Sequence, residues 1–360
     1  MTSPRSTQRA PQRVTILDVA RRAAVSRQTV SNVLTHPSRV RPDTLDRVRA
    51  AIDDLGYQPS SSAQSLRSQR AGAIGVEVNT LGPRSHNETM APFLASLGMR
   101  AGTHGAHVVP FGSPEDSPML QGYREMWARR LVDAFVVADT HHGDARPPWL
   151  EENGIPYASF GRVWDDPSFT CWVDVDGAAG TRAAVAQCAD AGYRTVAFLG
   201  WPRGSVVGDD RRLGWAQGCA DAGRAGGSVG VAGPEATAIQ DLDDARRAAR
   251  RLLSDLGPGD AVVCASDVLA LGVHHELLTA GLRPGADVGV VGFDGSENAV
   301  MHHLSTVAQP LDGIAEQVLA LLDDALAGRP RPAAGVLLDP TVHLDRSTAR
   351  HPLRPTKESS

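Results

Sequence analysis

VTILDVARRAAVSRQTVSNVLT, residues 14–35, predicts two short helices that meet at a tight turn. Apolar residues recur at helical spacing in both halves of this segment and would form one buried face. Those expected to pack together are Leu17, Ala20, Ala23, Ala24, Val30, Val33 and Leu34. Ser26 stands where an N-cap belongs, with its hydroxyl placed to accept from the N–H of Thr29 or of the residue before it. The segment therefore predicts a helix-turn-helix.

Polar residues at the start of the second helix are of the types that read DNA. Arg27, Gln28 and Asn32 can reach base edges, because Arg prefers guanine O6/N7 and Asn or Gln prefers adenine N6/N7. An ordinary helical hairpin remains an alternative, since short two-helix patterns arise by chance. The charge distribution favours DNA: residues 1–70 hold twelve Arg and five Asp without Lys or Glu, a net charge of +7, and the remainder carries −12.

The segment resembles the N-terminal region of the LacI/GalR family of transcriptional regulators. Residues 14–34 follow the family pattern V-T-x-x-D-V-A-x-x-A-G-V-S-x-x-T-V-S-x-V-L closely, and the similarity continues to Gly75. Ala24 departs from the pattern at a turn position that is usually Gly. If Ala24 is left-handed, it costs roughly 1–2 kcal/mol there. The resemblance implies contacts to DNA phosphates, which we assign to Thr15, Ser26, Thr29, Ser31, Thr35 and Arg39.

A third helix and a hinge follow. Pro42 marks a helix start and Gly56 lies just past its end, so residues 14–60 are expected to form the DNA-binding domain, after a disordered basic tail at 1–13. Residues 61–71 are polar and rich in Ser, which alone would suggest a flexible linker. The resemblance implies instead a hinge helix that folds on operator DNA. Its Leu66 would wedge into the minor groove and its Ala63 would pack the paired hinges.

From residue 72 apolar strands alternate with helices, which predicts parallel sheets covered by helices on both faces. Expected strands are 74–78, 107–111, 134–138, 157–160, 195–200, 261–265 and 288–293; expected helices include 177–191, 244–256 and 268–280. The resemblance implies a two-lobed α/β core similar to periplasmic binding proteins. This core would span residues 72–345, with crossovers between lobes near 171, 300 and 330. Residues 346–360 are expected to be a disordered tail.

A small effector is expected between the lobes, beyond the carboxyl ends of the strands. Arg211 and Asp294 match the family motifs R-x-x-G-[FYW] and V-x-G-[FY]-D and would bind vicinal hydroxyls, although a structural salt bridge would use the same residues. Ser266 stands where relatives often carry Asn, and Trp172 stands at a pocket-wall position, or belongs to the core. Weaker candidates are Arg162, Trp164 and Trp201, which follow predicted strands, and Asn79, in a loop that departs from the family.

These features predict a repressor: a homodimer that binds near-palindromic double-stranded operator DNA. Its effector would be a sugar or oligosaccharide, because aromatic faces stack on sugar rings and the chain has six Trp. A purine, nucleoside or phosphorylated metabolite is an alternative, which Arg162 and Arg203 leave open, and so is an effector that promotes DNA binding. The C-terminus lacks the heptads of a tetramerising coiled coil.

Other protein classes fit the sequence less well. No apolar run would span a membrane and residues 1–13 are not a secretory signal, so we expect a cytoplasmic, nucleoid-associated protein. The four Cys lie far apart without a CxxC motif. The side chains of adjacent histidines point in different directions on a helix or strand, so no metal is expected. No nucleophile elbow, P-loop or dinucleotide fingerprint is present in context, so we expect neither an enzyme nor a cofactor.

Overall fold

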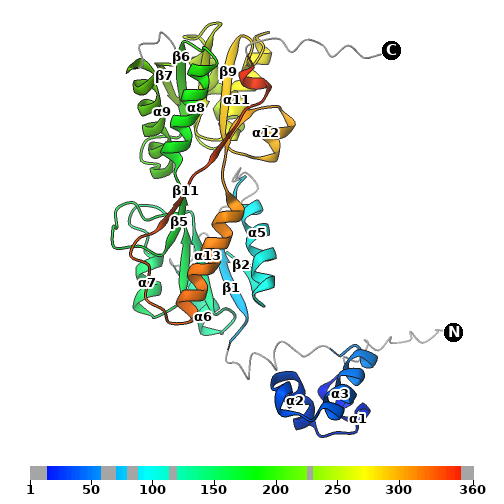
Figure 1. The fold of residues 1–360 in the computed structure, drawn as a ribbon. Helices are drawn as coiled ribbons and strands as arrows, with labels where there is room; N and C mark the ends of the chain where they lie inside the picture. The colour runs from blue at the N-terminus through cyan, green and yellow to red at the C-terminus, as the bar shows by residue number, and fades with distance from the viewer. Residues whose placement is uncertain (1–13, 58–69, 79–87, 113–119, 225–229, 350–360) are drawn as a thin grey trace, which may run out of the picture. The chain divides into compact units, whose positions relative to one another are not determined.

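The computed structural model describes residues 14–57, 70–78, 88–112, 120–224 and 230–349, apart from the side chain of Thr35. They belong to two compact units: residues 1–71, here called the head, and residues 72–360, here called the core (Figure 1). The predicted tail at 1–13, residues 350–360 of the predicted C-terminal tail and most of the expected hinge lie outside the described residues. Residues 346–349 were predicted to belong to the disordered tail, but they include a 3₁₀ helix in which Ser347 and Thr348 are buried.

The head is a three-helix unit. It comprises α1 (Ile16–Arg22), α2 (Arg27–Thr35), the short 3₁₀ helix η1 (Pro37–Arg39) and α3 (Pro42–Leu55). Its buried core consists of Val19, Ala20, Ala23, Val30, Val33, Val48 and Ala51. Leu17 and Leu34 were expected in this core, but Leu17 is 55% exposed and Leu34 38% exposed. Ile16 and Val19 take the inner face of α1, and Leu17 lies about 100° around the helix from Ile16.

The turn between α1 and α2 is left-handed at Ala24, whose φ is +52°. The N–H of Val25 donates to the carbonyl of Ala20 and closes the end of α1. The end of α3 has the same arrangement, with Gly56 at φ +57° and Tyr57 N–H donating to Ile52. Gly is suited to this conformation and Ala is not, so the turn at Ala24 is strained.

The core consists of two lobes, each built on a six-stranded sheet. In lobe A all pairs are parallel, in the order β11-β5-β4-β3-β1-β2. Its strands are β1 (Ala73–Glu77), β2 (His107–Phe111), β3 (Ala134–Ala138), β4 (Tyr157–Phe160), β5 (Trp172–Val175) and β11 (Val336–Leu338). Its helices are α5 (Met90–Thr103), α6 (Gln121–Ala128), α7 (Arg146–Glu152) and α13 (Leu311–Leu326). Helices α5 and α13 pack against each other.

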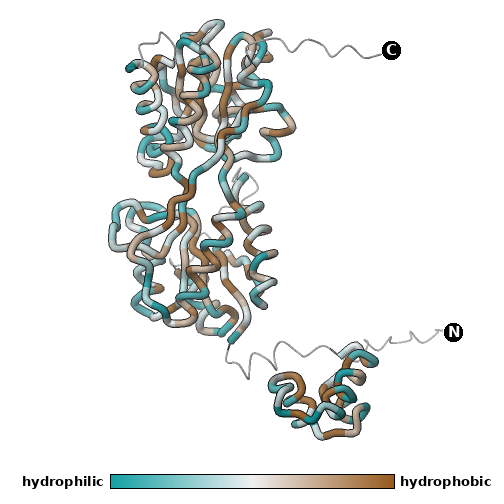
Figure 2. Tube along the Cα trace, in the orientation of Figure 1, coloured by the Kyte–Doolittle hydropathy of each residue, from teal (hydrophilic) through white to brown (hydrophobic). Residues whose placement is uncertain are grey.

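Lobe B has the order β12-β10-β9-β8-β6-β7, parallel except for the pair of β10 and β12. Its strands are β6 (Thr195–Gly200), β7 (Val231–Thr237), β8 (Asp260–Cys264), β9 (Val288–Asp294), β10 (Ser305–Ala308) and β12 (Thr341–His343). Its helices are α8 (Gly177–Asp190), α9 (Val206–Arg224), α10 (Leu242–Leu253), α11 (Asp267–Thr279), α12 (Glu297–Met301) and the 3₁₀ helix η2 (Arg346–Thr348). Helix α8 packs on α9 and α10 packs on α11, and Figure 2 shows hydrophobic residues along the strands.

The chain passes between the lobes three times. It leaves β5 for α8 at residue 176, β10 for α13 at 309–310, and β11 for β12 at 339–340 (Figure 1). All three passages come later in the chain than the predicted positions near 171, 300 and 330. The strands next to them are only three or four residues long, too short to be recognised from an apolar run.

Candidate functional site

The exposed start of α2 carries the residues predicted to read DNA. Ser26 caps this helix by accepting a hydrogen bond from the N–H of Thr29 at 3.1 Å. The side-chain amide of Gln28 donates to Asn32 Oδ1 at 3.2 Å, so these two residues lie one turn apart on the same face. Arg27 and Gln28 are exposed. Arg27 and Gln28 therefore lie in the first turn of α2, and Asn32 lies one turn further along the helix.

The residues expected at phosphates have different surroundings. The N–H and hydroxyl of Thr15 both donate to Asp18, at 2.9 and 2.6 Å, and these bonds hold the pKa of that carboxyl below its ordinary value. The hydroxyl of Thr29 is paired with that of Ser26 at 2.9 Å, and Arg39 is exposed on η1. Ser31 is half-buried. The predicted hinge residues Ala63 and Leu66, and the side chain of Thr35, lie outside what the structure describes.

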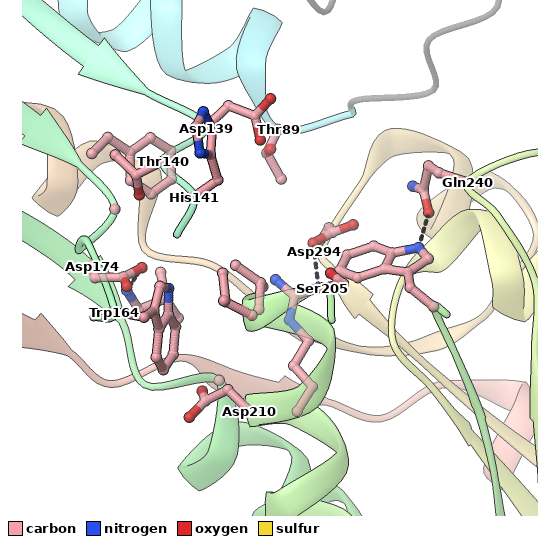
Figure 3. Close-up of a pocket in the computed structure, with 18 of the residues that line it drawn as sticks. Thr89, Asp139, Thr140, His141, Trp164, Asp174, Ser205, Asp210, Gln240 and Asp294 are labelled. Carbon is pink, nitrogen blue, oxygen red and sulfur yellow. Dashed lines mark hydrogen bonds and ion pairs between the residues drawn. The ribbon is translucent and has the colours of Figure 1, made fainter. Parts of the chain in front are cut away.

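In the core, a cavity of about 800 Å³ is lined by residues of both lobes. Lobe A contributes Glu88, Thr89, Asp139, Thr140, His141, Phe160, Trp164 and Asp174, and lobe B contributes Trp201, Ser205, Asp210, Arg211, Gln240 and Asp294, among others. Figure 3 shows Thr89, Asp139, Thr140 and His141 gathered on one side, with Asp294 and Gln240 on another. Volumes of 300–1,000 Å³ are typical of small-molecule sites.

Arg211 and Asp294 form a buried ion pair in this cavity. Arg211 Nη1 lies 3.3 Å from Asp294 Oδ1 and donates to the carbonyl of Ala265 at 2.5 Å. The guanidinium also lies over the ring of Phe293, 3.6 Å from its centroid. Gln309 donates a second hydrogen bond to Asp294 Oδ1 at 2.7 Å. The pair is therefore preorganised, with its hydrogen bonds concentrated on one carboxylate oxygen.

The backbone at Asp294 is unusual, with a φ of +120° at the end of β9. Asp267 holds the segment that follows Asp294 in place. Its carboxylate accepts hydrogen bonds from the N–H of Ser296 at 2.8 Å and from the hydroxyl of Thr306 at 2.6 Å. Burial raises the pKa of Asp294 to about 6, although Arg211 opposes this shift. Burial and the neighbouring Asp294 raise the pKa of Asp267 to about 7.

Arg162 lies behind the cavity wall. Its Nε is 3.0 Å from Asp174 Oδ2, its Nη2 is 3.6 Å from Asp210 Oδ2, and its guanidinium stacks over Trp164 at 3.7 Å. Burial raises the pKa of both carboxyls above the ordinary value, with Arg162 acting in the opposite direction. Arg162 thus neutralises and orients two acids that do face the cavity.

The remaining predicted effector residues are placed as follows. Trp164, Trp201, Arg211 and Asp294 line the cavity. Ser266 is fully buried and reaches it through Gln240, whose Oε1 accepts from both Ser266 and Trp201 at 2.8 Å. Neither Trp172 nor Arg162 is among the lining residues. The indole of Trp172 donates to the carbonyl of Phe169 and packs closely on Gly335, and Asn79 lies outside the described residues.

Several lining residues were missed from the sequence. Two of them, Asp139 and Thr140, directly follow strand β3. Another, Gln240, lies three residues after the end of β7, and Asp174 lies within β5. The rule that ligand-binding residues follow parallel strands would have found the residues after β3. It could not find Asp174 or Gln240, because β5 and β7 were not recognised.

Comparisons with known proteins agree with both units. A family model described as bacterial regulatory proteins, lacI family, matches residues 15–60, and one described as periplasmic binding protein-like domain matches residues 185–348. The HTH-type transcriptional regulator CelR of Thermobifida fusca is 30% identical over 335 residues, which cover 91% of this chain and 96% of CelR. The chain belongs to the LacI family.

Two further relatives are similar over nearly the whole chain. The HTH-type transcriptional repressor PurR of Klebsiella pneumoniae strain 342 is 27% identical, with 94% of this chain and 98% of PurR covered. A solved structure described as a complex of the transcriptional regulator CelR with cellobiose is 26% identical, with a TM-score of 0.66, and 93% of this chain and all of that one are covered. The relatives named here are transcriptional regulators.

The predicted family and fold are thus confirmed: a DNA-binding transcriptional regulator with a helix-turn-helix head and a periplasmic-binding-protein-like core of parallel sheets. Among the described helices, none combines the length and the apolar character that crossing a bilayer requires.

Proposed function

We propose that this protein is a sequence-specific repressor whose operator binding is controlled by a carbohydrate in the cavity between its lobes. The single observation that carries the effector half of this proposal is the pair of Arg211 and Asp294 inside a cavity walled by Trp164 and Trp201. A planar guanidinium and a carboxylate bind adjacent hydroxyls, and indole rings stack on the C–H faces of sugars. The CelR–cellobiose structure supports the same ligand class.

The DNA half depends on the head. Arg27, Gln28 and Asn32 read base edges, and the predicted phosphate-binding residues fix the register of α2 in the major groove. The protein acts as a homodimer on a near-palindromic site in the cytoplasm, and Leu66 and Ala63 form its minor-groove hinge. An effector that prefers one arrangement of the lobes separates the hinges and weakens DNA binding.

The proposal is tested first on DNA. Preferred sites are selected from random double-stranded DNA with the full-length protein, and affinity is then measured by fluorescence anisotropy at several salt concentrations. Asn32→Ala should relax preference at one base pair, at a cost of about 1–3 kcal/mol. Arg27→Ala should lower affinity for the selected site more than Arg49→Ala, a matched loss of charge on the exposed side of α3. Unchanged preference in Asn32→Ala would contradict the assignment.

The effector is then sought by thermal shift against monosaccharides, oligosaccharides and nucleobases. We expect sugars to bind, to lose affinity in Arg211→Ala, and to release the selected DNA. A purine is the second candidate, because PurR is among the relatives. If nucleobases bind and no sugar does, the effector class is a purine and the carbohydrate proposal is wrong. If the effector tightens DNA binding, the protein binds its operator in an effector-dependent manner.

A further inference from the structure

The cavity between the lobes carries an excess of negative charge. Five carboxylates line it: Glu88, Asp139, Asp174, Asp210 and Asp294. Arg211 is the single Lys or Arg among the described lining residues, and Arg162 adds one more guanidinium from behind the wall. These five acids outnumber the two guanidiniums by three. Such a cavity repels anions and attracts cations.

Both guanidiniums already have a carboxylate partner. Arg211 is committed to Ala265, Asp294 and the ring of Phe293, and Arg162 to Asp174, Asp210 and the ring of Trp164. Phosphate recognition by arginine uses two parallel N–H groups on one edge of the guanidinium. In Arg162 that edge faces Asp174 and Asp210 through Nε and Nη2, whereas both polar contacts of Arg211 use Nη1. The Nε of Arg211 has no partner among the described residues, and a single N–H suits a neutral hydroxyl.

Arg203 does not supply the missing positive charge. It follows Trp201 and Pro202, which line the cavity, but Arg203 itself does not. Its side chain is 60% exposed and pairs with Glu235 at 3.5 Å on the surface. From the sequence, Arg162 and Arg203 were candidates for binding a phosphorylated effector. In the structure both residues pair with acidic side chains, which argues against a phosphate-binding role for either of them.

Glu88 is the acid with unused binding capacity. Its Oε1 accepts a hydrogen bond from Asn298 Nδ2 of lobe B, whereas its Oε2 is buried and has no hydrogen-bond partner among the described residues. Glu88 also acts on Asp294: its negative charge contributes to the raised pKa of that carboxyl. Two carboxylates, one from each lobe, therefore repel each other across the cavity and would both be relieved by a cation between them.

We propose that the effector is an amino sugar, whose protonated amino group binds between Glu88 and Asp294 while its hydroxyls meet Arg211 and Gln240. This inference rests on the proposed function and narrows its ligand class to a cationic carbohydrate. The indole rings of Trp164 and Trp201 add a favourable surface for such a ligand, because aromatic faces attract cations. Glu88 belongs to residues 79–93, the same stretch as Asn79, where the sequence departs from the family pattern, so the preference is expected to be a property of this chain.

The test compares sugars that differ in one group, with the full-length protein, by calorimetric titration below the pKa of the amino group. Glucosamine is compared with glucose, N-acetylglucosamine and glucosamine 6-phosphate, and the β-1,4-linked glucosamine disaccharide with cellobiose. The amino form should bind at least tenfold more tightly than its neutral counterpart. Acetylation should remove this advantage, phosphorylation should weaken binding, and added salt should reduce the advantage.

The variant Glu88→Gln retains an oxygen to accept from Asn298 and removes the charge. It should lose most of the preference for the amino form, so that the ratio of the affinities for glucosamine and glucose approaches one. Glu152→Gln, an exposed acid on α7, is the matched control and should change neither. The salt dependence of the unmodified protein gives a second test if Glu88→Gln does not fold.

The possible failures are distinguishable. Equal affinity for amino and neutral sugars, or tighter binding of the phosphorylated form, overturns this inference and leaves the proposed function standing. Binding of nucleobases without any sugar, or of none of these compounds, overturns both.

Discussion

At the scale of single residues, two turns of the head offer a direct comparison. Ala24 and Gly56 have nearly equal positive φ values and end α1 and α3 in the same way. Ala24→Gly should stabilise the head by about 1 kcal/mol, because the left-handed strain outweighs the extra entropy that Gly gains on unfolding. Gly56→Ala, where a Cβ would meet nothing within 4 Å, should destabilise it by a similar amount. Amide hydrogen exchange of the head in the full-length protein measures both, and equal signs would contradict the explanation.

The carboxyl of Asp294 gives a prediction about pH. In the folded protein it keeps its proton up to a pKa of about 6, whereas in the unfolded chain it releases the proton near its ordinary pKa of 3.8. The folded state therefore binds more protons between these values, and the free energy of unfolding falls as pH rises from about 4 to 6.

Asp294→Asn removes this dependence and keeps an oxygen to accept from Arg211 and Gln309. Relative to the unmodified protein, it should gain stability between pH 4 and pH 7. Urea unfolding at several pH values checks the sign, and a relative loss would show that Arg211 stabilises the charged form more than burial opposes it.

At the scale of elements, α9 depends on close approach to α8. A Cβ on Gly214 would lie 2.1 Å from the carbonyl oxygen of Ala178, which is backbone and cannot rotate away. Gly214→Ala should cost about 2–3 kcal/mol, because the two helices must separate. Since α9 carries Arg211, effector affinity should fall as well. Gly223→Ala, on the same helix with open space around it, should be neutral or slightly stabilising, because Ala favours the helix more than Gly does. A similar loss of stability there would show that contact with Ala178 is not the cause of the loss in Gly214→Ala.

The same glycine shows what could be predicted from the sequence. The motif R-x-x-G-[FYW] located Arg211, and buried strands of five or six residues such as β3 and β6 were predicted with their observed bounds. The short strands β5, β10, β11 and β12 were missed because three or four residues carry too little periodicity. The resemblance placed Trp172 at the pocket wall, but its ring orientation depends on Gly335, which is distant in sequence. Asp174 and Gln240 could not be assigned because β5 and β7 were not recognised, and Glu88 could not be assigned because its position at the cavity depends on how the lobes meet.

At the scale of the whole molecule, the hydrogen bond from Asn298 to Glu88 joins lobe B to lobe A beside the cavity. Asn298→Ala should favour more open arrangements of the lobes and weaken effector binding about fivefold, which corresponds to about 1 kcal/mol for one hydrogen bond. Small-angle scattering of the unliganded protein and titration with the effector measure the two effects. Glu297→Ala, the exposed neighbour on α12, serves as the control. Weaker binding without a change in scattering would assign Asn298 to direct ligand contact.

The three passages between lobes also determine the order in which the molecule can form on the ribosome. Lobe A begins at β1 but needs α13, whose residues Ile314, Val318 and Leu322 are fully buried, and the edge strand β11. These emerge only after almost all of lobe B has been synthesised. Lobe A is therefore started first and completed last. Its incomplete sheet stays exposed to solvent while lobe B is synthesised and folds. A nascent chain stalled before residue 311 would have a nearly complete lobe B and a lobe A that lacks α13 and β11. We expect chaperones to bind the apolar surface that α13 would otherwise cover.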